Sequence, residues 1–265
     1  MPERESSMKI ALVTGASSGL GKEFVCQLDK RSSGDFEVFW LLARREDRLQ
    51  ELASTLTHPS EILPLDLRST DDLARLEAVL QKEKPQIRIL VNAAGLGKAG
   101  PFAEGEGALE EISEEIDVNV KALTLLTALA SPYLDKGSKV FEIASVAAFL
   151  PQPGFAVYAA SKAHVLSLSR ALAAAWKRRG ITVTAVCPNP METEFFLRAG
   201  ADPADLGLKK FGVEKVDTVV RHALRRAQRG KDISLSSVIP RLIHLSSKIL
   251  PTRWILAVEK LLGLY

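Results

Sequence analysis

Three side chains that could move a proton follow one another closely in the second half of the chain. Tyr158 and Lys162 stand four residues apart in YAASK, so in a helix they share one face. An ammonium beside a phenol stabilises the phenolate, which predicts a tyrosine pKa lowered from about 10 toward a useful acid–base range. Ser145 ends a buried apolar run, where its hydroxyl could polarise a substrate oxygen. Taken singly, the three are more typical of a half-buried tyrosine, a solvated charge and a strand-end cap than of catalytic residues.

A glycine-rich turn near the beginning of the chain could hold a phosphate group. The apolar run KIALVT passes through TGASSGLG directly into a helical pattern. Glycines let the backbone approach a pyrophosphate closely, and a helix N-terminus offers unpaired N–H groups and partial positive charge. A generic turn has the same glycines, but the preceding strand and following helix are the context that a dinucleotide site requires. The candidate residues are Gly15, Ser17, Ser18, Gly19, Leu20 and Gly21.

Two adjacent arginines, Arg44 and Arg45, follow the second apolar run. In a dinucleotide-binding sheet the adenosine ribose lies beyond the end of the second strand, where an acidic residue would bind a free 2′-hydroxyl. Guanidinium groups suit a 2′-phosphate in charge and geometry, so the pair favours NADP(H) over NAD(H). The alternative is ordinary surface charge at a helix start, which the helix dipole disfavours.

The spacing TGxxxGxG, together with Ser-x12-Tyr-x3-Lys, resembles the short-chain dehydrogenase/reductase family of the classical type. The resemblance covers residues 9–190 and supplies a fourth catalytic residue, Asn119 in DVNV, which in the family holds a water that links the lysine to solvent. It implies cofactor contacts from Asp66, Leu67, Asn92, Ala93, Gly95, Pro188 and Thr193, with Tyr158 and Lys162 serving the cofactor as well as catalysis. Two positions depart from the family pattern: Ala93 replaces the second Asn of NNAG, and Asn189 replaces the Gly after Pro188, although Asn also tolerates unusual φ.

The resemblance implies hydride transfer between the nicotinamide of NADP(H) and a ketone or secondary alcohol. Tyr158 would donate a proton to the developing alkoxide, and Ser145 would share that oxygen. We expect an apolar substrate such as a hydroxysteroid, because similar tails occur on family members that resemble steroid reductases. One alternative is a 3-oxoacyl-thioester reductase, which shares the same four residues. Another is a non-catalytic dinucleotide-binding regulator, against which the intact tetrad argues.

The elements that must position these residues alternate between short apolar runs and helical patterns. We expect strands at 9–14, 36–43, 61–67, 87–95, 139–145 and 181–188, and helices at 19–30, 46–56, 71–82, 109–134, 157–179 and 213–229. Continuous rather than alternating apolar runs are typical of parallel strands that are covered on both faces. The pattern therefore predicts an α/β chain with a Rossmann-type doubly wound parallel sheet and right-handed crossovers. We expect a single domain over 9–238, after a short polar lead at 1–8.

The rest of the chain is more variable in character. Residues 191–215 are expected to form a mobile substrate loop. The tail, 239–265, is rich in Leu and Ile with interleaved Lys and Arg, and Pro251 divides it into two helices. It could pack on the protein or on another subunit, roof the substrate pocket, or touch a membrane surface as a basic amphipathic helix. We favour packing on the protein over a peripheral membrane contact, since the apolar residues lie evenly around the last helix.

The long helices 109–134 and 157–179 resemble those that pair between subunits in this family. The second should expose an apolar stripe formed by Leu166, Leu168, Ala171, Leu172 and Ala175. We therefore expect a homodimer or homotetramer with two-fold symmetry.

Composition excludes several other classes of protein. The chain has 265 residues, 46% of them hydrophobic, and a formal net charge of only +3, so nothing favours binding to nucleic acid. The two cysteines and four histidines are scattered without metal-ligand spacing, so no metal site is expected. The start lacks a secretory signal and no run of about 20 apolar residues occurs, which predicts a cytoplasmic protein.

Overall fold

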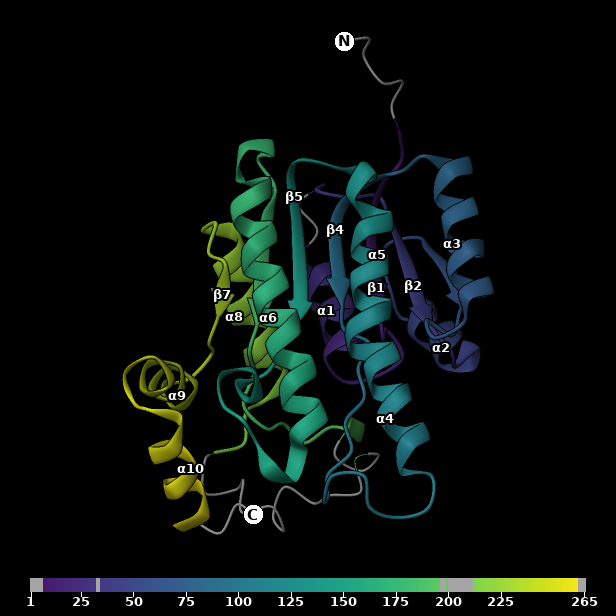
Figure 1. Ribbon diagram of the computed structural model, residues 1–265. Coiled ribbons are helices and arrows are strands. Elements are labelled where there is room, and N and C mark those ends of the chain that lie inside the picture. The colour runs from purple at the N-terminus through teal and green to yellow at the C-terminus, as the bar shows by residue number, and fades with distance from the viewer. Residues whose placement is uncertain (1–6, 32–33, 196–198, 200–211, 262–265) are drawn as a thin grey trace.

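A parallel sheet of seven strands forms the centre of the computed structural model, which describes residues 7–31, 34–195, 199 and 212–261 (Figure 1). The strands are β1 (Lys9–Thr14), β2 (Val38–Ala43), β3 (Ser60–Pro64), β4 (Gln86–Asn92), β5 (Leu134–Ile143), β6 (Thr182–Val186) and β7 (Ile233–Ser234). All neighbouring pairs in the sheet are parallel. The predicted doubly wound α/β fold is confirmed.

The order of the strands, β3-β2-β1-β4-β5-β6-β7, places a switch point in the middle of the sheet. The chain starts at β1, moves outward to β3, and then returns to the other side of β1 with β4. Connections on the two sides of this point lead away from each other, which leaves a crevice at the carboxyl ends of β1 and β4. The glycine-rich turn follows β1 and therefore lies at this crevice.

Helices cover both faces of the sheet, and each face has its own apolar core. They are α1 (Gly19–Lys30), α2 (Glu46–Ser54), α3 (Thr70–Glu83), α4 (Ala108–Ile116), α5 (Leu123–Ala130), α6 (Ala156–Trp176), α8 (Val216–Gln228), α9 (Val238–Ile249) and α10 (Thr252–Leu261). Side chains of α1, α2 and α8 pack on one face, around Val13, Leu41 and Phe141. Those of α3, α5 and α6 pack on the other, around Leu12 and Leu90, and Figure 1 shows α5 and α6 in front of the sheet. The strands read as continuous apolar runs because both of their faces are buried.

The structure differs from the predicted elements in two places. The helix expected over 109–134 consists of α4, a π-helical segment (Asp117–Ala122) and α5, and it ends at Ala130. Pro132 then starts a 3₁₀ turn, and β5 begins at Leu134 instead of residue 139. The seventh strand, β7, was not expected, since two residues are too few to show a periodicity.

The apolar stripe expected on the helix 157–179 is only partly present. Leu166 and Leu168 pack against one apolar cluster and Leu172 against another, so the three leucines are half-buried in the subunit itself. Ala171 and Ala175 are exposed, so the outer surface of α6 at these positions carries small side chains.

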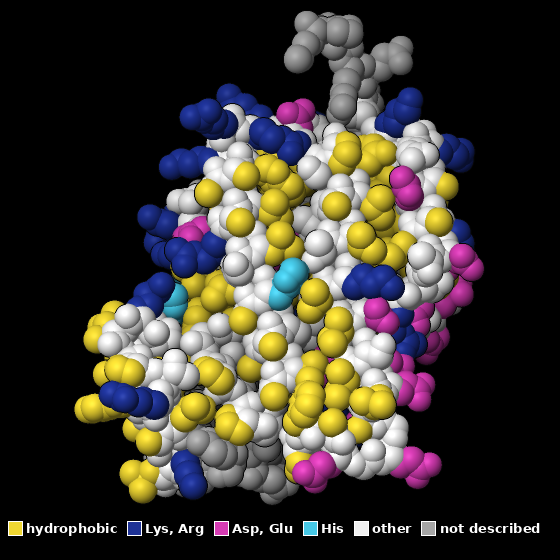
Figure 2. Space-filling view, in the orientation of Figure 1, with side chains coloured by type: hydrophobic (Ala, Val, Ile, Leu, Met, Phe, Trp, Pro, Cys, Tyr) yellow, Lys and Arg dark blue, Asp and Glu magenta, His cyan; other side chains and the backbone are white. Residues whose placement is uncertain are grey.

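The tail forms the two helices expected on either side of Pro251, α9 and α10, at the carboxyl end of the sheet (Figure 1). In the space-filling view, apolar and basic side chains lie side by side over these helices (Figure 2). Within the described ranges, no helix is both long and apolar enough to span a bilayer. Most of the polar lead, residues 196–198 and 200–211 of the expected substrate loop, and the last residues of the tail lie outside the described residues.

Candidate active site

A cavity of ≈ 530 Å³ opens at the carboxyl ends of the strands, at the switch point. Its walls come from the turn after β1, the segments that follow β2, β3 and β4, the residues after β5 and β6, the first turn of α6, and the tail. Of the residues predicted for the site, those that line it are Gly15, Ser17, Ser18, Gly19, Leu20, Arg44, Arg45, Asp66, Leu67, Ala93, Gly95, Ser145, Tyr158, Lys162, Pro188 and Thr193. Gly21, Asn92 and Asn119 do not line it.

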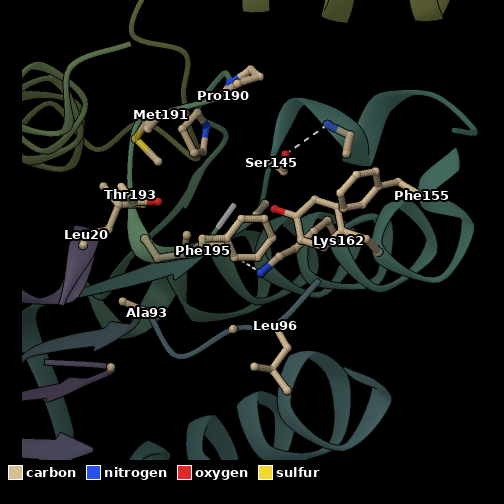
Figure 3. A pocket seen from close by; sticks show the side chains of 18 of the residues that line it. Leu20, Ala93, Leu96, Ser145, Phe155, Lys162, Pro190, Met191, Thr193 and Phe195 are labelled. Carbon is tan, nitrogen blue, oxygen red and sulfur yellow. Dashed lines mark hydrogen bonds between the residues drawn. The ribbon is translucent and has the colours of Figure 1, made fainter. Parts of the chain in front are cut away.

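The serine, tyrosine and lysine predicted to act together meet in this cavity. Ser145 follows β5, and its Oγ accepts a hydrogen bond from the Ala147 amide at 3.2 Å. Tyr158 and Lys162 project from the first two turns of α6, and the Tyr158 hydroxyl is hydrogen-bonded to Ser145. The Lys162 Nζ donates to the Ile143 carbonyl at 2.9 Å and lies 5.7 Å from the centre of the Tyr158 ring. In the view of Figure 3, Lys162 lies between Thr193 and Leu20 on one side and Phe155 on the other.

Asn119 lies behind this group rather than in the cavity wall. It is fully buried in the π-helical segment, and its side chain holds the loop after β4. The Oδ1 accepts from the Leu96 amide at 2.9 Å, while the Nδ2 donates to the Leu96 carbonyl at 2.8 Å and to Ser161 Oγ at 3.0 Å. A side chain at Gly95 would stand 3.4 Å from both Asn119 Oδ1 and Lys162 Nζ, so glycine lets the two residues approach each other. The asparagine thus fixes the backbone beside the lysine.

The expected lowering of the tyrosine pKa is wrong for this cavity. Burial raises the pKa of Tyr158 to about 12, and the hydrogen bond from Ser145 opposes that rise only in part. Burial also lowers the pKa of Lys162 to about 8, although two carboxylates favour its charged form. Desolvation is the largest cause of both shifts, because it disfavours the charged form of each group. A phenol that keeps its proton at neutral pH is a proton donor, as the reduction of a carbonyl requires.

The two carboxylates beside the lysine were not singled out in the sequence. Glu142 on β5 is fully buried, and burial raises its pKa to about 7 against hydrogen bonds from Asn92 and Thr127. Glu115 on α4 is also buried, which raises its pKa to about 7, and it lines a smaller cavity of ≈ 180 Å³. In sequence, Glu142 differs from its neighbours as the one charged residue in the apolar run VFEIA, and that interruption was the available signal.

The turn after β1 has the close contacts that its glycines predict. Gly15 has φ +63°, and a Cβ there would come within 2.8 Å of the Ala94 amide nitrogen. A Cβ on Gly21 would lie 2.3 Å from the Gly15 carbonyl oxygen, so this glycine seats α1 on the turn rather than lining the cavity. The Thr14 hydroxyl accepts from the Ala93 and Ala94 amides at 3.0 and 3.2 Å, which ties the turn to the end of β4.

Arg44 and Arg45 both line the cavity but in different settings. One Nη of Arg45 donates to Ser17 Oγ and Ser18 Oγ at 3.1 and 3.2 Å, and the other pairs with Glu194 at 3.0 Å. Arg48 pairs with the same carboxylate. Arg45 is therefore built into the turn itself, whereas Arg44 contributes its charge near Asp66.

Of the other predicted cofactor residues, Asp66 lines the cavity and Asn92 lies in the core. The Asp66 carboxylate accepts from Arg68 Nε and Nη2 at 3.1 and 2.7 Å, and the hydrogen bond to Arg68 holds the pKa of Asp66 below its ordinary value. Asn92, in contrast, is 2% exposed and its amide points into the core toward Glu142 and Thr127. The Asn92 side chain therefore does not line the cavity, because at the end of β4 it faces the helices rather than the crevice.

The segment after β6 carries the departure at Asn189. Among the described residues, positive φ at a residue other than glycine occurs only at Lys84 and Ala103, so Asn189 is not needed for its backbone freedom. Instead the side-chain Nδ2 of Asn189 donates to the Gly212 carbonyl at 2.6 Å, and its backbone N–H donates to Glu214 Oε2 at 3.0 Å. Thr193 would contact a side chain at Gly19 at 3.9 Å, which places it across the mouth of the turn.

Aromatic and aliphatic side chains complete the part of the cavity around the tyrosine. Phe155 and Phe195 contact the Tyr158 ring, with centroids 5.5 and 5.2 Å from it. The tail contributes Ile243, Ser246, Leu250, Ile255 and Val258 to the lining. Of the three interpretations of the tail, the one in which it roofs the pocket fits the side of the tail helices that faces the cavity. Among the described residues, no group of three or more His, Cys, Asp or Glu side chains could hold a metal ion.

Comparison with known proteins agrees with this geometry. Residues 9–203 match the family model for the short chain dehydrogenases. The chain is 32% identical over 185 residues to an uncharacterized short-chain type dehydrogenase/reductase of Sinorhizobium fredii, which covers 70% of this chain but only 33% of that longer protein.

Solved structures match over almost the whole chain. A short-chain dehydrogenase from Sphingobium yanoikuyae in complex with NADPH is 30% identical, with a TM-score of 0.75 over 97% of this chain and 94% of that one. A bulky-bulky ketone specific alcohol dehydrogenase from Comamonas testosteroni is 27% identical, with a TM-score of 0.71 over 98% and 94%. Other structures of the same fold were solved with NADP or with NADH. The chain thus belongs to the short-chain dehydrogenases, a family of oxidoreductases that act on alcohol- and ketone-type substrates.

Proposed function

We propose that this chain is an NADP(H)-dependent reductase of bulky, apolar ketones, and an oxidant of the matching secondary alcohols. The observation that carries the proposal is one continuous cavity, which joins the turn after β1 to Tyr158 and is roofed by apolar residues of the tail. The candidate cofactor-binding residues, a proton donor and an apolar surface for the substrate thereby line the same cavity. Ligand sites of open α/β sheets occur at this same switch point.

NADP(H) fits the residues at one end of the cavity. The N-terminus of α1 is exposed to the cavity at Gly19, where an added Cβ would meet nothing closer than Thr193 at 3.9 Å. That space suits a pyrophosphate, which the amides and the dipole of α1 would bind. Arg44 and Arg45, which follow β2 and line the cavity, would bind a 2′-phosphate, and Lys162 would hold the nicotinamide ribose. When bound, the nicotinamide supplies or accepts the hydride.

The chain's own residues manage the proton and the oxygen. Tyr158 keeps its proton at neutral pH and would give it to the alkoxide that forms on reduction. Ser145, which already hydrogen-bonds the tyrosine hydroxyl, would bind the same oxygen. The Ile143 carbonyl holds Lys162 Nζ beside the phenol, and Asn119 holds the neighbouring loop after β4. The proposed catalytic residues are accordingly Ser145, Tyr158 and Lys162, and Asn119, also predicted as catalytic from the sequence, is proposed as a positioning residue that acts through the backbone that it holds.

The lining around the tyrosine favours a large apolar substrate. Phe155, Phe195 and the tail residues Ile243 and Ile255 present hydrocarbon to the reacting oxygen. A specificity for bulky ketones in the relative from Comamonas supports the same class for this chain. Steroidal ketones are one member of this class, and we retain them as substrates to be tested.

The test is NADPH oxidation by the purified chain with three kinds of carbonyl: a ketosteroid or diaryl ketone, a small aliphatic ketone, and a 3-oxoacyl thioester. We expect kcat/KM to be highest for the bulky ketones and higher with NADPH than with NADH. A preference for the thioester would replace this proposal by the thioester reductase. Tight NADPH binding without oxidation by any of the three would favour a dinucleotide-binding regulator instead.

We also propose that the protein is a cytoplasmic homodimer or homotetramer. Both cysteines are free, in keeping with a reducing compartment. Leu109 and Ile116 on α4 and Leu125 on α5 are exposed, beside the small side chains on the outer surface of α6. A second copy could cover this apolar face by two-fold pairing.

A further inference from the structure

Exposed apolar side chains are concentrated in the tail. Of the twelve large apolar residues that the described part of the chain exposes, eight lie between residues 238 and 261. We call them the tail surface: Val238, Leu242, Leu245, Ile249, Leu250, Trp254, Val258 and Leu261. Their exposed fractions run from 44% for Leu250 to 86% for Leu261. Single exposed apolar residues are ordinary, but a gathering of this size marks a surface that binds something.

Most of the tail surface lies apart from the side of the helices that holds them to the protein. Pro240 and Ile255 are buried, Ile243 lines the cavity, and the His244 ring packs at a tilt against Phe149 with ring centroids 4.5 Å apart. The roofing contacts therefore use one side of α9 and α10, and the tail surface is additional. The sequence favoured packing on the protein for all of these residues, but the structure buries only some of them.

Basic side chains accompany the tail surface. Arg241, Lys248, Arg253 and Lys260 are all exposed, and the sequence from 238 to 261 holds a single acidic residue, Glu259. Figure 2 shows dark blue side chains among the yellow ones over α9 and α10. Apolar side chains with interleaved cations, among them a tryptophan, are the composition by which an amphipathic helix lies in the interface of an anionic bilayer.

The charge distinguishes a lipid surface from a second copy of this chain. Two-fold pairing of the tail surface would bring the four cations of one copy against the same cations of the other, with little acid to balance them. The phosphate groups of a bilayer would pair with these cations instead. The exposed apolar residues on α4 and α5 lie elsewhere and remain available for subunit pairing.

The tail surface is also continuous with the cavity. Leu250 and Val258 both line the cavity and are 44% and 53% exposed, so they form its rim. We propose that the tail surface docks on the anionic face of a lipid bilayer, with the rim of the cavity turned toward the lipid. The docking depends only on the tail. Entry of an apolar ketone directly from the bilayer rests, in addition, on the proposed function.

Vesicle flotation of the full chain tests the docking without using activity. Two kinds of vesicle are needed, one of phosphatidylcholine alone and one with phosphatidylglycerol added. We expect binding at least ten-fold stronger to the anionic vesicles and weakened by salt. Two triple variants should each reduce that binding ten-fold or more. One is Leu242→Ser with Leu245→Ser and Trp254→Ser, and the other is Lys248→Gln with Arg253→Gln and Lys260→Gln. None of these six residues lines the cavity.

Matched controls separate docking from misfolding and from assembly. Phe102→Ser, which removes an exposed apolar residue away from the tail and from the proposed subunit interface, should leave vesicle binding unchanged. Thermal unfolding should show that each triple variant is folded. Docking is overturned if the folded parent binds neither vesicle, if it binds both equally, or if the Ser variant changes the mass in solution, which would assign the surface to a second copy. Docking without reduction of any ketone would reject the proposed function alone.

Discussion

Asn92 donates its side-chain amide to both carboxylate oxygens of Glu142, at 3.1 and 3.0 Å, inside the core. The two residues are partners in register on the neighbouring strands β4 and β5. Thr127 on α5 donates to the same carboxylate at 2.9 Å. The asparagine that the family resemblance assigned to the cofactor thus serves a buried acid, and that acid acts on Lys162 through its charge.

The first prediction concerns stability and pH at Glu142. Its pKa of about 7 in the folded chain exceeds the ordinary 4.5, so the unfolded chain loses this proton first as pH rises. Ionisation of Glu142 leaves the free energy of unfolding unchanged below about pH 4.5. From there to pH 7 it lowers that free energy progressively, and above pH 7 the loss is constant at roughly 3 kcal/mol. In denaturant unfolding, the free energy of unfolding of Glu142→Gln relative to the parent should therefore rise by about that much between pH 4 and 8. Any cost of the amide itself is the same at every pH. The exposed Glu110→Gln serves as control, and a difference independent of pH at Glu142 would contradict the prediction.

The second prediction concerns the proton donor. Tyr158→Phe should lower kcat by about 10²–10⁴-fold, since general acid catalysis is lost, while NADPH binding stays within a few-fold of the parent. The matched control is Tyr133→Phe, at a half-buried tyrosine outside the cavity, which should leave both quantities unchanged. Activity of Tyr158→Phe close to that of the parent would reject the assignment.

The third prediction separates the two arginines. Arg44→Ala should weaken NADPH roughly ten- to hundred-fold and NADH hardly at all, because a charge-assisted hydrogen bond is worth about 1.5–3 kcal/mol. Arg45→Ala should weaken both cofactors, since Arg45 also holds Ser17 and Ser18 in the phosphate turn. Binding titrations with both cofactors decide, with the exposed Arg75→Ala as reference. Equal losses for NADPH and NADH in Arg44→Ala would remove the argument for a bound 2′-phosphate.

The fourth prediction tests the roof of the cavity. Ile255 is 8% exposed and lines the cavity, whereas Leu261 on the same helix is 86% exposed. Ile255→Ala should raise KM for bulky ketones by roughly ten-fold or more, since apolar contacts of this size are worth about 1–3 kcal/mol, and should spare small ketones. Leu261→Ala should change neither. Equal effects on large and small substrates would show that the tail supports the fold and not the substrate.

The fifth prediction concerns assembly. Leu125→Arg on α5 should convert the dimer or tetramer to a smaller species in light scattering, because it places a charge in the expected interface. Leu242→Arg on the tail should leave the mass unchanged. A monomeric parent at micromolar concentration would exclude the assembly that we propose.

Much of this arrangement could be predicted from the sequence because its signals are local. The apolar runs of β1, β4 and β6, the glycines after β1, and the four-residue spacing of Tyr158 and Lys162 are each visible within a few residues. The bounds of α1 follow from a periodicity of the same local kind, and Pro251 marks the break between the two helices of the tail.

What could not be predicted depends on contacts between distant segments. The direction of the Asn92 side chain follows from its partner on β5, and the extent of Tyr158 burial follows from Phe195 and from the cavity walls. Asn189 serves through its side chain rather than through its backbone conformation, because that side chain donates a hydrogen bond to the distant Gly212 carbonyl. The π-helical segment at Asn119 has no distinct periodicity over so few residues, and β7 is too short to show one.

The hydrogen bonds from Ala93 and Ala94 to Thr14 close the phosphate turn across 79 and 80 residues of chain. β2, α2, β3 and α3 all lie within that stretch. Closing so long a segment costs entropy that is recovered only when β1 and β4 pair, and sheets with such distant pairings fold slowly. We therefore expect the turn after β1 to close late in folding, and substitutions that weaken the pairing of β1 with β4 should delay the recovery of cofactor binding after refolding more than the recovery of helix content.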